Sequence, residues 1–342
     1  MAKILALNKK KSIILEPKVP YNFDASFYKP SHFPSSDNVW EKEKYWITMI
    51  WKSKRLGLKF ENIGTVNKPK IKVNIYSQKE LSKDFIDSLI PEIRWRFNFD
   101  QNISEFCEKF KNDKVLGSII KKWQGMKPIA ANSLYETLII YLVLQNTTVR
   151  RSVQMLENLF GRFGGKAKFD GRILSTFWEP KDMARSTEQE IRDLRVGYRA
   201  KFFTKITEQF VNKEINELAL RKMSKEEVKK EMLKFYGIGS ASVEYLLFED
   251  FYFLDSLETI PPWEQKINSL SSFLNFCDPE ELCLTKRGLA KSSVVALSTS
   301  SNPVKYLVND ITHQFHHPCR GFGRSEERAQ PPTCTSAMLS LN

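Results

Sequence analysis

Histidine is scarce in this sequence, and its distribution excludes several kinds of active site. The chain has 342 residues but only 4 histidines, and none lies between His32 and His313. A catalytic centre in that central stretch therefore has no imidazole of its own. Ser-His-Asp groups, Cys-His pairs and His-ligated zinc are disfavoured there, because each needs an imidazole. Chemistry in the centre of the chain must depend on carboxylates, hydroxyls, lysine or an external cofactor.

Cysteine and long apolar runs are also scarce. The 5 cysteines are few and odd in number, so we expect no disulfide framework and a reducing compartment. The longest apolar run, 138–144, is far shorter than the roughly 20 residues of a membrane span. The N-terminal apolar stretch is too short for a secretory signal. We therefore expect a cytoplasmic protein without a membrane partner, or a nuclear one in a eukaryote.

Acidic residues are outnumbered by basic ones. Lys plus Arg number 53 and Asp plus Glu number 40, which gives a net charge of +13. This surplus favours a polyanionic partner, and nucleic acid before a membrane. The hydrophobic fraction of 42% and the charged fraction of 27% are ordinary for a soluble chain with a buried core.

The hydrophobic pattern divides the chain into three segments. Within 1–102, the stretches 12–16, 45–51 and 70–77 are strand-like, which predicts a small antiparallel sheet with one or two helices. From 103 to about 270 the period approaches 3.6, which predicts an all-helical bundle with short loops. The predicted fold class is therefore α+β, with an N-terminal sheet domain over 1–102 and a mainly α-helical domain over 103–283. Residues 284–342 show neither period, which predicts a poorly ordered tail.

Two capping boxes mark helix starts within the predicted bundle. Ser133 is followed three positions later by Glu136, and Ser224 by Glu227. In this pattern the serine hydroxyl and the glutamate carboxylate each accept a bond from a backbone amide of the first turn.

The most informative segment is 231–255, which predicts two helices joined by a glycine turn. Gly237, Ile238 and Gly239 form the turn, and a helix starts at Ser240. Glycine permits positive φ and leaves backbone amides uncovered. Uncovered amides at a helix N-terminus bind anions such as a nucleic-acid phosphate, without reading sequence. A helix–helix turn with no ligand is the alternative.

Four segments in order resemble the helix-hairpin-helix DNA glycosylase superfamily. They are GMKPIAANSLYETLIIYLVLQNTTV at 125–149, LRVGYRAKFF at 194–203, KFYGIGSASVEYLL at 234–247, and the aspartate Asp255 that follows them. Residues 1–124 are similar in kind to the sheet-bearing N-terminal domains of 3-methyladenine and 8-oxoguanine glycosylases. The resemblance covers about the first 270 residues. It implies an enzyme of base-excision repair that flips a damaged base from duplex DNA and hydrolyses its N-glycosidic bond.

The resemblance also implies a carboxylate that stabilises the oxocarbenium-like sugar of this reaction. Asp255 is the first candidate. It lies sixteen positions after Gly239, which is short for the family, so Glu264 and Glu258 stay open as alternatives.

Bifunctional family members carry a lysine just after the hairpin turn, where Ser240 and Ala241 stand here. The resemblance thus implies a monofunctional hydrolase. Alkylated purines are the first candidate substrate, and hypoxanthine, uracil and oxidised guanine stay open. Cys277 and Cys283 are only a pair, so the family's iron–sulfur cluster is not expected. We predict no cofactor and no metal site, and leave open only a monovalent cation at the hairpin. The expected partner is double-stranded DNA with a damaged base, bound by a monomer.

Further residues are assigned through the resemblance. The predicted DNA contacts are Gly237, Ile238, Gly239, Ser240, Ala241, Gln145, Asn146, Arg199 and Lys201. The predicted base pocket is aromatic, because flipped bases stack, with Trp123, Tyr135, Tyr198 and Trp263 as candidates. Aromatic residues at helical spacing also suit a core, which is the alternative for each. A non-catalytic helix-hairpin-helix DNA-binding module is the alternative function.

Overall fold

The N-terminal half of the molecule is built on an antiparallel sheet. The computed structural model describes residues 4–28, 35–113 and 116–256. A five-stranded sheet runs in the order β2-β6-β5-β4-β3, with β2 (Lys9–Leu15), β3 (Asn38–Glu41), β4 (Lys44–Trp51), β5 (Lys54–Asn62) and β6 (Ile71–Ser77). Every neighbouring pair is antiparallel. The predicted N-terminal sheet is confirmed, and its three predicted strands correspond to β2, β4 and β6.

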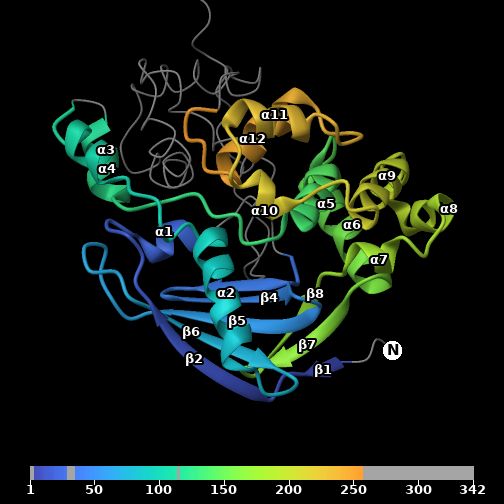
Figure 1. Cartoon of the computed structure of the whole chain (residues 1–342), viewed down its shortest axis with the longest axis horizontal. Coiled ribbons are helices and arrows are strands. Elements are labelled where there is room, and N and C mark those ends of the chain that lie inside the picture. The colour runs from blue at the N-terminus through green and yellow to red at the C-terminus, as the bar shows by residue number, and fades with distance from the viewer. Residues whose placement is uncertain (1–3, 29–34, 114–115, 257–342) are drawn as a thin grey trace, which may run out of the picture.

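Two helices cover one face of this sheet, α1 (Phe23–Phe27) and α2 (Lys83–Arg96). Figure 1 shows α2 lying across the strands. Between the helices and the sheet, the rings of Phe27, Phe60 and Phe97 lie within 4.3–5.2 Å of one another. Each ring is buried, and burying one such side chain contributes about 1.5–3 kcal/mol. The aromatic residues of the N-terminal segment therefore form the core of this half.

A second, three-stranded sheet was not predicted. It runs in the order β1-β7-β8, with β1 (Ile4–Ala6), β7 (Gly165–Phe169) and β8 (Arg172–Thr176). The prediction that 103 to about 270 is all helical is therefore wrong at 165–176. The physical reason is the turn between β7 and β8, where Asp170 has φ 46° and Gly171 has φ 75°. Positive φ at both central residues gives the tight turn whose twist matches paired strands.

The β7–β8 hairpin docks on the outer face of the five-stranded sheet. The Asp170 carboxylate accepts hydrogen bonds from the Trp46 indole at 2.7 Å and the Tyr76 hydroxyl at 2.8 Å. The Phe169 ring occupies the space above Gly57. Strands from the start and the middle of the chain thus form one packed unit, while the predicted domain boundaries at 102 and 283 stay predictions.

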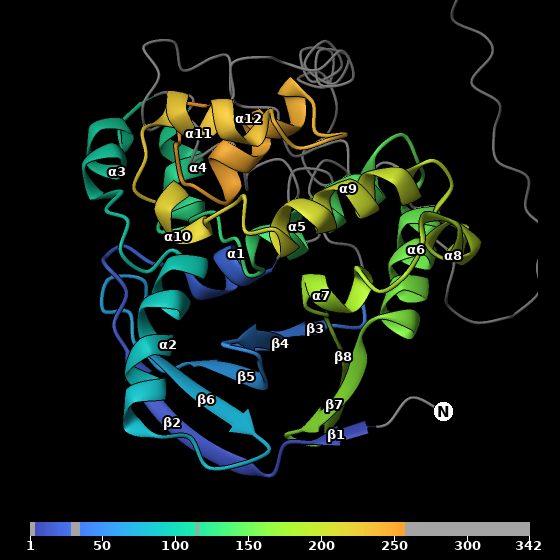
Figure 2. The same ribbon diagram turned by 45° about the vertical axis from the view of Figure 1, so that its right-hand side comes forward.

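The remaining described elements form the helical half (Figure 2). They are α3 (Ser104–Phe110), α4 (Leu116–Trp123), α5 (Leu134–Leu144), α6 (Val149–Arg162), α7 (Pro180–Met183), α8 (Glu188–Ile191), a π-helical turn (Arg192–Val196), α9 (Arg199–Val211), α10 (Glu217–Leu220), α11 (Lys225–Met232) and α12 (Ser240–Glu249). Nine of the eleven residues of α5 are buried, so α5 is the central helix. The capping boxes at Ser133 and Ser224 are confirmed. The predicted tail, 284–342, lies outside the described residues.

The contact between Phe169 and Gly57 gives a stability prediction. A Cβ atom on Gly57 would lie 2.5 Å from the Phe169 ring, so Gly57→Ala should destabilise the fold by about 1–3 kcal/mol through overpacking. Gly161 lies in α6 with open space around its Cβ position. Gly161→Ala should therefore stabilise the fold by about 0.5–1 kcal/mol. Urea unfolding of both variants checks this, and equal effects of the two substitutions would contradict the proposed docking.

Candidate nucleic-acid interface

The glycine turn joins α11 and α12 as the sequence predicts. Ile238 is 5% exposed and belongs to the core of the helical half. Gly237 has φ 92°, and the Phe202 ring lies 2.7 Å from the position that a Cβ atom would occupy there. Phe202 therefore supports the turn from beneath, and only glycine fits at 237.

The start of α12 is left without a side-chain cap. Gly239 is its N-cap residue and supplies no side-chain hydrogen bond, whereas α5, α6 and α11 begin with a serine or threonine cap. Gly239, Ser240 and Ala241 are exposed. The first amides of a helix have no partner within the helix. The turn therefore presents donors, together with the positive end of the helix dipole, at the surface.

The C-terminal end of α5 is bonded to this turn. The Gln145 side-chain amide donates to the carbonyl of Gly237 at 2.7 Å. The Arg199 guanidinium donates from Nε to the carbonyl of Leu142 at 2.8 Å, and from Nη2 to the carbonyl of Gln145. Arg199 is buried, and burial lowers the pKa of its guanidinium from the ordinary value. Arg199 and Gln145 therefore hold the end of α5 and the glycine turn together.

Two other predicted contacts point outward. Asn146 follows Gln145 with φ 44° and is exposed. Lys201 is also exposed, and its ammonium lies 5.3 Å from the centre of the Tyr236 ring. The predicted set thus separates into inner residues, which fix the backbone, and outer residues, which are accessible to a ligand. Direct contact of any of them with DNA stays a prediction.

The carboxylate candidate Asp255 lies at the other end of the hairpin. Its Oδ2 is 2.9 Å from the Lys225 ammonium, and its side chain is 45% exposed. Lys225 is the first residue of α11, and α11 runs from there towards the glycine turn. The two alternatives, Glu258 and Glu264, lie outside the described residues.

The predicted pocket residues have different surroundings. Tyr135 is buried, and its hydroxyl lies 2.9 Å from Thr207 Oγ1 and accepts from Trp178 Nε1 at 3.3 Å. Burial raises the pKa of Tyr135 to about 12. Tyr135 is therefore part of the core, which was the alternative to a position in the base pocket. Tyr198 is 46% exposed, and Trp263 lies outside the described residues.

Trp123 is partly buried, and so is Tyr245, which the sequence analysis did not single out. Trp123 and Tyr245 both pack against the apolar cluster that joins α3 and α4 to α12. Tyr245 lies four positions after Ala241, and residues at that spacing share a helix face. The four-residue spacing from Ala241 was the signal in the sequence that could have identified Tyr245. Tyr245 and Ala241 therefore face the same side of α12.

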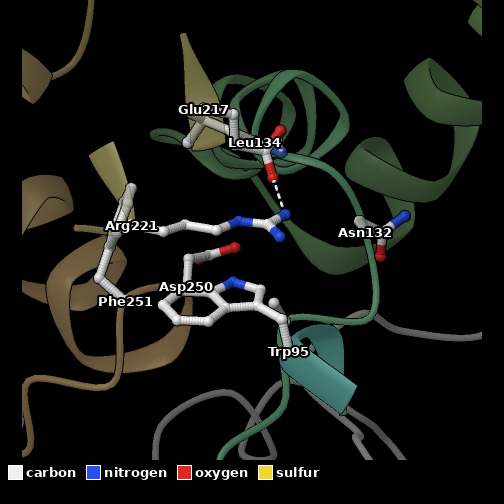
Figure 3. Close-up of a pocket in the computed structure, with 8 residues that line it drawn as sticks. Trp95, Asn132, Leu134, Glu217, Arg221, Asp250 and Phe251 are labelled. Atoms are coloured by element: carbon white, nitrogen blue, oxygen red, sulfur yellow. Dashed lines mark hydrogen bonds and ion pairs between the residues drawn. The ribbon is translucent and has the colours of Figure 1, made fainter. Parts of the chain in front are cut away.

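A pocket lies where α2, α10 and the end of α12 meet (Figure 3). Its lining residues are Trp95, Ala130, Asn132, Leu134, Glu217, Arg221, Asp250 and Phe251. Two of its lining residues belong to an ionic cluster, in which Arg221 donates to the buried Glu92 at 2.6 and 2.9 Å and also to Glu217. Arg96 donates to Glu92 at 2.6 Å. The sequence analysis missed this cluster, because its members come from distant segments.

The ionic cluster joins the two halves of the molecule. Glu92 and Arg96 belong to α2, and Arg221 follows α10. Burial alone would raise the pKa of Glu92, but the guanidinium groups of Arg221 and Arg96 hold it below the ordinary value. Glu92 is therefore ionised and doubly paired, which suits a structural anchor.

Comparison with known proteins gives consistent results. No protein-family model matches the chain. A DNA-3-methyladenine glycosylase of Bacillus subtilis is 21% identical over 189 residues, which are 52% of this chain and 62% of that enzyme. The chain thus matches about three fifths of the length of this relative. A 3-methyladenine DNA-glycosylase from Archaeoglobus fulgidus superposes with a TM-score of 0.61 at 14% identity, covering 84% of this chain and 96% of that one.

A third comparison involves a DNA complex. The 8-oxoguanine glycosylase/lyase of Clostridium acetobutylicum, bound to double-stranded DNA with cytosine opposite 8-oxoguanine, superposes with a TM-score of 0.56. It is 15% identical and covers 83% of this chain and 96% of its own. The chain has the fold of the DNA glycosylases. The resemblance to helix-hairpin-helix glycosylases is confirmed, as is the α+β fold class.

Two classes of feature are not found in the described part of this glycosylase fold. Across 4–28, 35–113 and 116–256, no group of three His, Cys, Asp or Glu side chains is placed to hold a metal ion. Over the same ranges, no helix is long and apolar enough to cross a membrane.

Alanine substitutions at the two turn glycines should have different effects on stability. Gly237→Ala combines an unfavourable positive φ with a clash against Phe202, so it should destabilise the glycosylase fold by about 1–3 kcal/mol. Gly239 has φ −95° and open space around its Cβ position, so Gly239→Ala should leave stability nearly unchanged. Thermal unfolding measures both, and a stable Gly237→Ala variant would refute the geometry of the turn.

The ionic cluster predicts a specific pH dependence. Because the pKa of Glu92 is lowered in the folded state, its stabilisation is present above the unfolded pKa of about 4.3 and is lost as pH falls through the folded value. Glu92→Gln should cost about 1–3 kcal/mol at pH 7, because Arg221 and Arg96 each lose one carboxylate partner and keep only Glu217 and Glu136. It should also flatten the loss of stability below pH 5.

Urea unfolding at several pH values between 3 and 7 checks this prediction. Asp87→Asn is the matched control, because Asp87 is an exposed carboxylate on the same helix. A Glu92→Gln variant as stable as the control at pH 7 would contradict the anchoring role.

Proposed function

We propose that this chain is a monofunctional DNA glycosylase of base-excision repair, which hydrolyses the N-glycosidic bond of a damaged and flipped purine. The observation that carries the proposal is the start of α12, which has no side-chain cap and lies within a glycosylase fold. The turn before α12 is hydrogen-bonded to Gln145, and the next residue, Asn146, is exposed. The proposed ligand is double-stranded DNA with one damaged base, bound by a monomer. The proposed location is the nucleoid, or the nucleus in a eukaryote.

The glycine turn grips the DNA backbone in this proposal. The amides of Gly239, Ser240 and Ala241 lie at the positive end of α12, where a phosphate is favoured. The surface amine of Lys201 adds charge to the same side. Asn146 then enters the space left by the flipped base. These contacts position the enzyme on any sequence, because they involve backbone and not base edges.

The hydrolysis needs a carboxylate beside the sugar. An ionised carboxylate stabilises the developing positive charge and orients the attacking water. Asp255 is the proposed group, with Glu264 and Glu258 as alternatives. The Lys225 ammonium lies 2.9 Å from Oδ2 of Asp255 and so occupies one oxygen of this carboxylate. All three carboxylates must therefore be tested together.

The surroundings of the hairpin support hydrolysis without a lyase step. Ser240 and Ala241 offer no amine after the turn, and Lys234, before it, pairs with Glu231 at 2.6 Å. Tyr245, on the Ala241 face of α12, and Trp123 of α4 both pack against one apolar cluster and supply partly buried aromatic rings. Such rings suit a cationic alkylated purine, because the ring face attracts positive charge. No cofactor takes part in this scheme, and a monovalent cation at the hairpin is the one ion it leaves open.

A non-catalytic DNA-binding module is the second candidate. The observation that favours it is the position of Asp255, at the end of the hairpin away from the glycine turn and paired with Lys225. A module of this kind would keep the phosphate grip and release no base.

Base release tests the proposal directly. Duplexes that each carry 3-methyladenine, hypoxanthine, uracil or 8-oxoguanine are incubated with wild type, Asp255→Asn, Glu264→Gln and Glu258→Gln. Wild type should release the alkylated purine, with strand breaks only after alkali. Loss of the working carboxylate should slow release by about 100-fold or more.

The pattern among the variants decides the assignment. Slow release by Asp255→Asn alone supports Asp255, whereas slow release by Glu264→Gln or Glu258→Gln moves the role to that residue. Strand breaks before alkali would contradict a monofunctional enzyme. No release from any lesion, with duplex binding intact, would favour the non-catalytic module.

A further inference from the structure

Three aromatic rings form a row beside the glycine turn. Tyr198 contacts Phe202 edge to face at 5.5 Å between ring centres, and Phe202 contacts Tyr236 in the same way at 5.4 Å. We call Tyr198, Phe202 and Tyr236 the aromatic row. Phe202 also fills the space beneath Gly237, so the row continues directly into the turn.

The outer rings of the row are not part of the core. Tyr236 is 45% exposed and Tyr198 is 46% exposed. Leu233, on the same connection between α11 and the turn, is 47% exposed. Contiguous exposed apolar groups of this kind mark interaction sites. The central ring, Phe202, contacts both outer rings. The outer rings are therefore already positioned and lose little conformational freedom when a ligand binds.

The charge around the row indicates an anionic partner. The Lys201 ammonium lies over one face of the Tyr236 ring, 5.3 Å from its centre, so a base stacks either on the other face or in place of this ammonium. The uncapped amides of α12 lie just beyond Gly237. An aromatic face beside cationic groups and anion-binding amides is the combination that proteins use for unpaired nucleotides, because the rings stack on bases while the charges hold phosphates.

We propose that Tyr236 is a stacking platform for an unpaired base, so that the hairpin holds single-stranded as well as duplex DNA. The occupant is a nucleotide adjacent to the phosphate gripped by Gly239, Ser240 and Ala241. This inference rests on the DNA-binding part of the proposed function and does not depend on catalysis. An intact duplex hides its base faces, so it gains little from the platform.

Binding of two probes tests the platform. The probes are a single-stranded thymidine oligonucleotide and an undamaged duplex of the same length, at one fixed ionic strength. Tyr236→Ala should weaken single-strand binding by about fivefold or more, while duplex binding changes by less than about twofold. Tyr236→Phe keeps the ring and should bind both probes as wild type does. Ser240→Asp puts a negative charge at the amides and should weaken both.

Ile14→Ala is the control, since Ile14 is an equally accessible apolar residue on β2, 57% exposed and in the sheet half. It should change neither affinity. Equal loss of both probes in Tyr236→Ala, no loss of either, or failure of wild type to bind the single strand would overturn the platform. Single-strand binding that depends on Tyr236, in a chain that releases no base, would refute the glycosylase and leave the platform standing.

Discussion

The hydrogen bonds of the buried Arg199 guanidinium are the interactions on which the proposed DNA interface depends. The guanidinium donates to two carbonyls at the end of α5 and so holds the backbone of Gln145 in place. Gln145 in turn donates to Gly237, which connects the end of α5 to the glycine turn. A buried hydrogen-bonded charge is costly to displace, because the guanidinium would be left without partners. The turn at Asn146 and the start of α12 are therefore held in a fixed relative position. This arrangement suits the proposed duplex, whose backbone must be bound while one base is flipped out.

The rigidity of this surface extends into the sheet half. Glu92 of α2 pairs with Arg221, which follows α10 and lines the pocket of Figure 3. On the other side, Asp170 and Phe169 of the β7–β8 hairpin dock on the five-stranded sheet through Trp46, Tyr76 and Gly57. Both contacts use residues far apart in the sequence. The sheet half is thus a support that fixes the helices, rather than an independent neighbour joined by a linker.

Local signals in the sequence predicted much of the fold. Capping boxes at Ser133 and Ser224 depend only on neighbouring residues, so they could be recognised without the structure. The Asp170–Gly171 turn is also a local signal, but the prediction of helices over 103 to about 270 did not include it. By contrast, the burial of Arg199 and of Tyr135 depends on which helices pack together, and no local pattern reports that. Sequence therefore located the motifs of the candidate site, but it did not separate the residues that shape the surface from those that are exposed on it.

A crystal structure of the chain bound to a duplex with one stable abasic-site analogue tests the proposed interface most directly. A phosphate oxygen should lie within hydrogen-bond distance of the amides of Gly239, Ser240 or Ala241. Asn146 should lie in the gap opposite the abasic site, while Arg199 stays on the carbonyls of Leu142 and Gln145. DNA bound to another face, or an Arg199 that leaves α5 to contact the DNA backbone, would contradict the proposed interface.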